Sequence, residues 1–388
     1  MRRALVVGGT GQTGPLVVRG LLDRGYAVTI LHGGQHEVAS PGAQHIHADV
    51  HFLESITRAL DGLTFDVAVC MYGRSRFVAE ALRGKVPRIV MVTGAAYAFR
   101  EPRRAEWGPF GVTAADENAP FSDDKSVDRL GTLVAATERH VLDLAGAGHY
   151  HVTILRYPRI YGPGCLSARI HWSVVRRILD ARPFFIVADG GLRLTSRAYR
   201  DNAAHALLLA VDAPERPSGR IYNVADDPPV LTIGQEVQAL ADALGHQWEL
   251  LSLPSDLVER VYLGYFGYHC VLDTTRIRAE LGYQDLVPAP EALDRTARWW
   301  AEHGPSVAGA VEPKMADRFD YAAEDNLVRS YRLTTRDLLA DAPAPLAKAH
   351  PFRHPTAPGQ EWTQRIVVEG GHAQADAWHR ATYPYDLS

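Results

Sequence analysis

Cysteine is scarce in this sequence, which has only Cys70, Cys165 and Cys270 among its 388 residues. None of the three lies in a Cys-x-x-Cys pair or in another spacing typical of metal ligands. A sparse, odd number of cysteines gives no disulfide framework and is typical of proteins from a reducing compartment. We therefore expect a cytoplasmic protein without a disulfide-stapled fold.

The sequence also lacks a large net charge and a long apolar run. Its 41 Lys and Arg residues against 45 Asp and Glu give a formal net charge of -4, which argues against a nucleic-acid partner and an anionic membrane surface. No apolar run approaches the roughly 20 residues of a membrane span. The segment before the first strand is too short for the apolar core of a signal peptide, so we expect none.

A glycine-rich turn lies near the start of the chain. Gly8-x-x-Gly11-x-x-Gly14 follows the apolar run 4–7 and precedes a helical pattern at 15–22. In this strand–turn–helix context the glycines let the backbone approach a pyrophosphate, and the helix N-terminus faces the phosphates. A tight turn without a ligand is the alternative, and the context argues against it. The candidate cofactor contacts in this turn are Gly8, Gly11, Gln12, Thr13 and Gly14.

The end of the second predicted strand bears on the choice of cofactor. In dinucleotide folds an acid at this position binds the ribose 2′-OH, whereas a nearby Arg accommodates a 2′-phosphate. The strand here ends in Leu31-His32-Gly33-Gly34, with neither residue type. Because no acid is present to repel a phosphate, the sequence leans towards NADP over NAD, with His32 or His36 as its partner. Solvated loop histidines are the alternative.

Strands and helices alternate through the first part of the chain. Predicted strands at 27–31, 44–50, 65–70 and 88–92 are separated by turns and helices. This alternation predicts an α/β fold with a Rossmann-type doubly wound parallel sheet, whose ligand lies at the carboxyl ends of the strands. The histidines of the third strand have no nearby carboxylate except Asp49 at its end, so we expect no metal site.

After residue 165 strands and helices no longer alternate regularly, which predicts a smaller substrate lobe of mixed structure. Thr232 and Gln235 predict a capping box at the start of one of its helices. Residues 305–388 form an extension of unassigned role, in which Phe319-Asp320-Tyr321 is predicted to be ordered but irregular. The expected division is 1–165 with about 198–230 as the dinucleotide-binding domain, 166–197 with 231–304 as the substrate lobe, and 305–388 as the extension.

These features resemble the extended short-chain dehydrogenase/reductase family, the NAD-dependent epimerase/dehydratase group, over about residues 3–303. The glycine turn is that family's cofactor turn, and residues 156–163 match its Arg-x-Pro-x-x-Tyr-Gly-Pro loop, which touches nicotinamide and substrate. Asp49-Val50 matches its adenine contact, and Met71-Tyr72-Gly73 matches the segment beside the cofactor ribose. The cofactor contacts that the resemblance adds are Asp49, Val50, Tyr72, Gly73, Thr93 and Pro158.

The family's catalytic pair is missing. Its members use a Tyr-x-x-x-Lys pair on one helix, in which Lys lowers the Tyr pKa and holds the ribose while Tyr transfers the proton. Aligning the helix at 129–144 places Leu130 at the Tyr position and Val134 at the Lys position, and no Tyr-x-x-x-Lys occurs anywhere in the chain. The hydroxyl position after the fifth strand falls on Ala95. The apolar replacements predict a helix face that packs rather than reacts.

The first functional hypothesis is an atypical NAD(P)-dependent oxidoreductase of small-molecule or secondary metabolism, acting on a carbonyl or hydroxyl group. Hydride transfer belongs chiefly to the cofactor, so another side chain would supply the proton. Tyr72 leads the candidates, because the family usually has a small residue there, and a packing aromatic is its alternative. The other catalytic candidates are Tyr161, Thr93 and Tyr97. Arg156 or Arg159 would polarise an oxygen, although Arg156 also suits a structural ion pair and Tyr161 a packing role.

Two further classes stay open. The same fold supports an isomerase, dehydratase or lyase, with a base from the loop at 97–127. Relatives without the Tyr-Lys pair also include nucleotide-sensing and RNA-binding proteins, but the acidic charge balance and the lack of a basic stripe argue against RNA. The only partner we expect is a small-molecule substrate. The resemblance also allows a homodimer through the helix at 129–144.

Overall fold

The computed structural model of the chain describes residues 1–34, 40–71, 75–95, 114–119, 129–165, 169–261, 269–307, 311–315, 317–344 and 358. The chain divides into two compact units, residues 1–325 and 326–388. The first unit holds the central sheet and the predicted substrate lobe. Within the described residues no helix is both long and apolar enough to cross a membrane.

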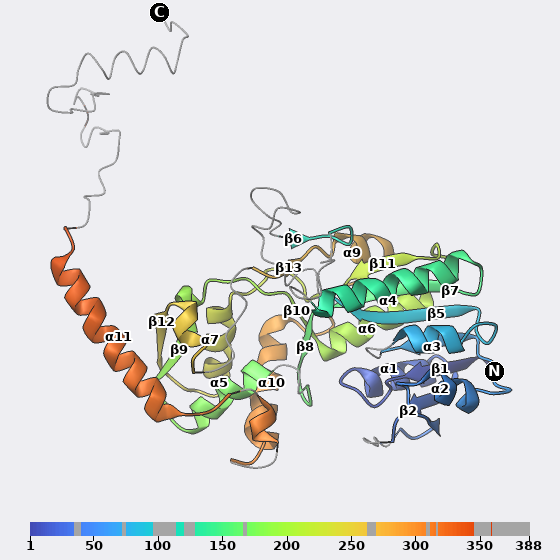
Figure 1. The fold of residues 1–388 in the computed structure, drawn as a ribbon, viewed down its shortest axis with the longest axis horizontal. Coiled ribbons are helices and arrows are strands. Elements are labelled where there is room, and N and C mark those ends of the chain that lie inside the picture. Colours follow the sequence, from blue (N-terminus) through green and yellow to red (C-terminus); the bar gives the residue numbers. More distant parts are fainter. Residues whose placement is uncertain are drawn as a thin grey trace, which may run out of the picture. The chain divides into compact units, whose positions relative to one another are not determined.

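Seven parallel strands form the central sheet, in the order β11–β7–β5–β4–β1–β2–β3 (Figure 1). The sheet grows outward from β1 in both directions, so the order reverses between β1 and β4, and such a switch point is where open parallel sheets bind ligands. The predicted doubly wound sheet is confirmed. The strands are β1 (Arg3–Val7), β2 (Ala27–His32), β3 (Ala43–His47), β4 (Val67–Cys70), β5 (Arg88–Gly94), β7 (His151–Tyr157) and β11 (Arg220–Asn223).

Helices cover both faces of this sheet. Alternate residues of β1 enter different cores, Val6 on one face and Val7 on the other, and both are fully buried. On the Val6 side lie α1 (Gly14–Asp23) and α6 (Arg200–Asp212). On the Val7 side lie α2 (Leu53–Ala59), α3 (Ser75–Ala81) and α4 (Arg129–Gly146).

The remaining elements of the first unit form short parallel strand pairs and helices. Their apolar centre includes Trp172 and Trp300, both buried. The capping box predicted at Thr232 and Gln235 is confirmed. The paired strands are β8 (Arg159–Tyr161) with β10 (Arg197–Tyr199), β9 (Phe184–Ala188) with β12 (Glu249–Leu253), and β6 (Ala114–Ala115) with β13 (Val271–Leu272). The helices are α5 (Arg169–Leu179), α7 (Ile233–Ala243), α8 (Ser255–Val258), α9 (Thr275–Leu281), α10 (Ala289–His303) and the 3-10 helices η3 (Asp189–Gly191) and η4 (Glu312–Met315).

The structure differs from the sequence prediction at two places. The third strand ends at His47, so Asp49 lies in the following loop and not on the strand. The prediction of irregular structure at 319–321 was wrong beyond Asp320, because helix α11 (Tyr321–Asp341) begins there. The Asp320 carboxylate accepts a hydrogen bond from the Ala323 N–H at 3.0 Å, which satisfies one of the free donors of the first turn.

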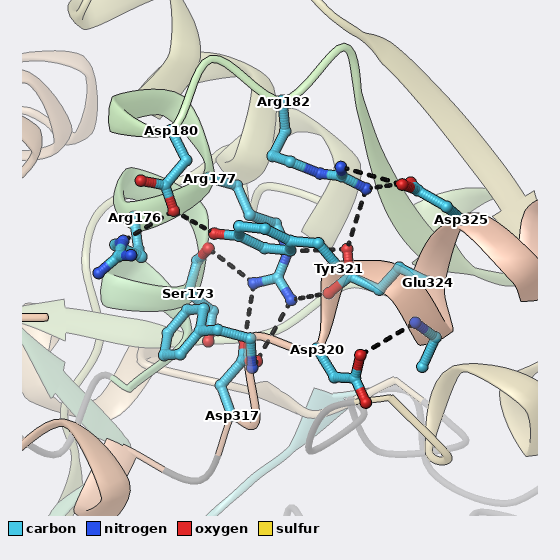
Figure 2. A network of polar contacts seen from close by, with 12 residues as sticks. Ser173, Arg176, Arg177, Asp180, Arg182, Asp317, Asp320, Tyr321, Glu324 and Asp325 are labelled. Atoms are coloured by element: carbon cyan, nitrogen blue, oxygen red, sulfur yellow. Dashed lines mark hydrogen bonds and ion pairs between the residues drawn. The ribbon is translucent and has the colours of Figure 1, made fainter. Parts of the chain in front are cut away.

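A buried ion-pair network holds the segment 311–325 against α5. Figure 2 shows the Arg177 guanidinium of α5 between Asp317 and Glu324. The distance from Arg177 Nη1 to Asp317 Oδ2 is 2.7 Å, and the three side chains are exposed by only 1%, 0% and 2%. Burial alone would lower the pKa of Arg177, but its bonds to both carboxylates raise it above its usual value. Residues 311–315 and 317–325, which lie in the predicted extension, are therefore part of the packed first unit.

Candidate functional site

The glycine turn lies at the switch point of the sheet and is packed so tightly that side chains would not fit. Gly8 has a φ of +90°, which L side chains rarely adopt, and a Cβ there would lie 2.8 Å from the Met71 carbonyl oxygen. A Cβ on Gly14 would lie 2.4 Å from the backbone of Gly9. Met71 directly follows β4, and its N–H donates to the Val7 carbonyl at 2.8 Å. The turn therefore brings the start of α1 close against the sheet.

Gly11 is the glycine of this turn with the most space. A Cβ on Gly11 would touch only the Gly8 carbonyl oxygen, at 3.2 Å, so the peptide is open on its outer side. Helix α1 begins at Gly14 with Pro15 in its first turn and no acidic residue there, which leaves the positive end of its dipole uncompensated. Gln12 is partly buried, and buried Thr13 directs its hydroxyl to the Met71 sulfur at 3.6 Å. The turn fits the pyrophosphate of a dinucleotide.

His32, at the end of β2, is buried and hydrogen bonded within the protein. Its Nδ1 accepts a hydrogen bond from the Gly34 N–H at 3.2 Å, and its Nε2 lies 3.0 Å from His45 Nδ1. An accepting Nδ1 places the proton of the neutral ring on Nε2, which then donates to His45. The ring also meets that of His47 at 4.6 Å between centroids. Both nitrogens of His32 are therefore engaged, and its role beside a 2′-phosphate stays a prediction.

The two residues expected at the adenine edge lie in the loop after β3. The Asp49 carboxylate lies 2.7 Å from His51 Nδ1 and also accepts the His51 N–H at 2.9 Å. Val50 is buried and packs in the core on the α2 side of the sheet. The Ala48 N–H donates to the His32 carbonyl at 3.1 Å, so this loop begins beside the end of β2. A contact of Asp49 or Val50 with adenine stays a prediction.

Thr93 donates a hydrogen bond to an ion pair beneath the end of β5. Its hydroxyl lies 2.6 Å from Glu138 Oε1 on α4. The same carboxylate receives two hydrogen bonds from Arg156 on β7, with 2.6 Å between Nη2 and Oε2, and both side chains are 4% exposed. The expectation that Arg156 forms a structural ion pair is thus confirmed. The Thr93 hydroxyl has a buried partner, and its role in proton transfer stays a prediction.

Of the two α4 positions that align with the family's Tyr and Lys, Val134 lies at the end of β5. Leu130 is exposed, so the prediction of a packed helix face was wrong at this residue. A Cβ on Gly94, the last residue of β5, would lie 3.8 Å from Val134 Cγ2, so Val134 packs at that strand end. Ala95 is fully buried, and Leu130 is 58% exposed. None of the three has a group that transfers a proton at neutral pH.

The loop after β7 contains Pro158 and Tyr161. Pro158 is buried between β7 and β8. Tyr161 is 1% exposed, and its hydroxyl donates to Asp226 Oδ2 at 2.8 Å. Burial raises the pKa of Tyr161 well above its usual value, and the adjacent Asp226 raises it further. These surroundings favour the packing role over acid catalysis, and a catalytic role of Tyr161 stays a prediction.

Several predicted site residues lie outside the described residues. They are His36, Tyr72, Gly73 and Tyr97. The sequence reasoning also missed Glu138 and Asp226 as the partners that hold Thr93, Arg156 and Tyr161. Glu138 lies eight residues after Leu130, but nothing in its spacing identifies the strand residues that it meets.

The chain is similar to several known proteins. Residues 114–225 match the NAD dependent epimerase/dehydratase family. The uncharacterized protein YbjS of Escherichia coli is 27% identical over 49% of this chain and 62% of its own length. Sterol demethylase protein B of Methylococcus capsulatus is 26% identical over 77% of this chain and 98% of its own.

Solved structures share the fold. The dTDP-glucose 4,6-dehydratase of Streptomyces venezuelae, with NAD and TYD bound, superposes with a TM-score of 0.61. Its identity is 20%, over 78% of this chain and 97% of that chain. Residues 114–225 therefore match the NAD-dependent epimerase/dehydratase family, and the chain shares the fold of solved epimerases and dehydratases, while its sequence has no Tyr-x-x-x-Lys.

Proposed function

We propose that the protein is an atypical nicotinamide-dependent oxidoreductase that acts on a carbonyl or hydroxyl group of a small metabolite. The tightly packed glycine turn supports it most directly, because a Cβ would clash with the Met71 carbonyl at Gly8 and with the Gly9 backbone at Gly14. A nicotinamide dinucleotide supplies or accepts a hydride when it is bound. The turn binds the pyrophosphate, and the open side of Gly11 lets the backbone reach it.

The proton donor of this reaction lies outside α4. Leu130 and Val134 offer no acid or base, and the Thr93 hydroxyl is hydrogen bonded to Glu138. Val134 and Ala95 instead place apolar side chains at the end of β5, which limits the access of water to that strand end. Tyr72, next to the switch point in sequence, is the donor that we propose.

A titration with NADPH and NADH tests the proposed function. We expect nicotinamide fluorescence to change on binding of both, with tighter binding of NADPH, and a panel of carbonyl substrates to reveal net oxidation of the cofactor. Binding without turnover on any carbonyl would favour the isomerase, dehydratase and nucleotide-sensing alternatives. If neither dinucleotide binds, the proposed function is wrong.

Substituting Tyr72 tests the proposed donor. Tyr72→Phe is expected to lower kcat by about 100- to 10,000-fold, the usual contribution of a general acid, with little change in NADPH affinity. Tyr150→Phe is the matched control, because the buried Tyr150 hydroxyl has no hydrogen-bond partner among the described residues and Tyr150 directly precedes β7, at the opposite end of that strand from the predicted ligand site. Unchanged turnover in Tyr72→Phe would exclude this tyrosine as the donor.

A further inference from the structure

Among the described residues, Arg159 is a partly buried cation without an ion-pair partner. It is the only buried or partly buried arginine or lysine of those residues whose side chain makes no hydrogen bond or ion pair. Its positive charge nevertheless acts in the interior of the lobe, where it favours a lower pKa of Glu236, His171 and Cys270. Removing a guanidinium from water without a partner is unfavourable, so an anionic ligand beside Arg159 would be stabilising.

The backbone places Arg159 at the carboxyl end of the sheet. It follows Pro158 directly after β7, and the Tyr157 carbonyl at the end of that strand accepts the Ala95 N–H at 2.9 Å. Arg159 then begins β8, opposite Arg197 of β10. Substrates of open parallel sheets lie beyond these strand ends. Arg159 is therefore two residues beyond the point where β5 and β7 end side by side.

The acids around Arg159 already have partners. Glu236 lies 3.0 Å from Arg197 Nη2 and 2.7 Å from His171 Nε2. Burial alone would raise the pKa of Glu236, but Arg197 and His171 lower it to about 2, so this single negative charge balances Arg197. Burial lowers the pKa of His171, which keeps the ring neutral.

The second nearby acid is also engaged. Asp226 accepts hydrogen bonds from the Tyr161 hydroxyl at 2.8 Å, the Asn202 side chain at 3.0 Å and the Tyr199 N–H at 2.8 Å. Burial raises the pKa of Asp226. Among the described residues, neither carboxylate forms an ion pair with the Arg159 guanidinium.

We propose that Arg159 binds an anionic oxygen group of the substrate, a carboxylate or a phosphate. This inference rests on the proposed function and adds the class of substrate, an acid whose charged group lies on the lobe side of the reacting carbon. A guanidinium suits this role because its planar N–H groups bind two oxygens of a carboxylate or phosphate at once. Arg156, three residues earlier, does not suit this role because its guanidinium already pairs with Glu138.

Calorimetric titrations with oxalate and with inorganic phosphate, at constant ionic strength and without dinucleotide, test this proposal. We expect Arg159→Met to weaken the binding of the preferred anion by about tenfold or more, and Arg159→Lys to retain part of it. Because the Arg159 side chain has no hydrogen-bond or ion-pair partner in the described part of the chain, neither variant should change the thermal midpoint. Arg260→Met is the matched control, since Arg260 is an exposed arginine of the same lobe, and it should bind like the unmodified protein.

The outcomes separate this proposal from the proposed function. Absence of anion binding, or equal affinity in Arg159→Met, would overturn it whether or not dinucleotides bind. Repeating the oxalate titration with saturating NADH distinguishes the source of the anion. Undiminished oxalate binding supports a substrate group, whereas its loss would assign Arg159 to the dinucleotide and overturn the proposal. A protein that binds oxalate through Arg159 but neither NADH nor NADPH would refute only the proposed function.

Discussion

Arg177→Met is expected to lower the free energy of unfolding by about 3–5 kcal/mol, the usual cost of removing one partner from a buried ion pair. The substitution removes the cation between Asp317 and Glu324, which are exposed by only 0% and 2%. Asp317 would then stay buried without its positive partner, and Glu324 would keep only the more distant Arg182, with 3.8 Å between Nη2 and Oε2. Methionine approximates the length of the arginine stem, so the loss comes chiefly from charge and hydrogen bonds and less from packing.

Urea unfolding followed by circular dichroism measures this change. Arg298→Met is the matched control, because Arg298 also forms an ion pair, 2.8 Å from Asp294, but both side chains are largely exposed. It should have a far smaller effect, since water screens exposed pairs. The variant Arg177→Met with Asp317→Asn and Glu324→Gln should recover part of the loss, because no unpaired charge remains. Equal effects of Arg177→Met and Arg298→Met would show that the network does not anchor residues 311–325.

The sequence predicted the parts of the fold that depend on local patterns. The glycine turn, the alternating strands and the capping box at Thr232 each depend on neighbouring residues, so spacing reveals them. Helix α11 was missed although Asp320 caps it. Its signal, one Asp before a run of polar and apolar residues, is common in loops as well. The anchoring of this segment by Arg177 joins residues 140 or more positions apart, which no local pattern records.

As with the fold, the sequence predicted those parts of the candidate site that depend on short motifs. The sequence indicated the cofactor turn and the absent Tyr-Lys pair, because both are short motifs. It offered both Arg156 and Arg159 for polarising an oxygen and favoured an ion pair for Arg156, without identifying the partner. The fold supplies that partner, since Glu138 of α4 pairs with Arg156, whereas no acid among the described residues pairs with Arg159. Whether an arginine has a carboxylate partner depends on residues from distant segments, and the packing of the fold brings these residues together.

Gly11→Asp is expected to weaken dinucleotide binding by about 100-fold or more while leaving the protein folded. A side chain on Gly11 meets only the Gly8 carbonyl oxygen at 3.2 Å, so it would project outward from the turn. There a carboxylate would occupy the position proposed for the pyrophosphate, and juxtaposed like charges cost several kcal/mol. It would also compete for the positive end of α1. Nicotinamide fluorescence measures the affinity, and a thermal melt checks the fold.

Two variants of the same turn separate charge from packing. Gly11→Ala adds a methyl group without charge, and its affinity should stay closer to that of the unmodified protein. Gly14→Ala instead places a Cβ 2.4 Å from the Gly9 backbone, so it should lower the thermal midpoint as well as the affinity, because α1 must move away from the sheet. If Gly11→Asp binds NADPH and NADH as well as the unmodified protein does, the phosphates bind elsewhere. The close packing of Gly8 and Gly14 would then serve only to hold α1 on the sheet, without a ligand.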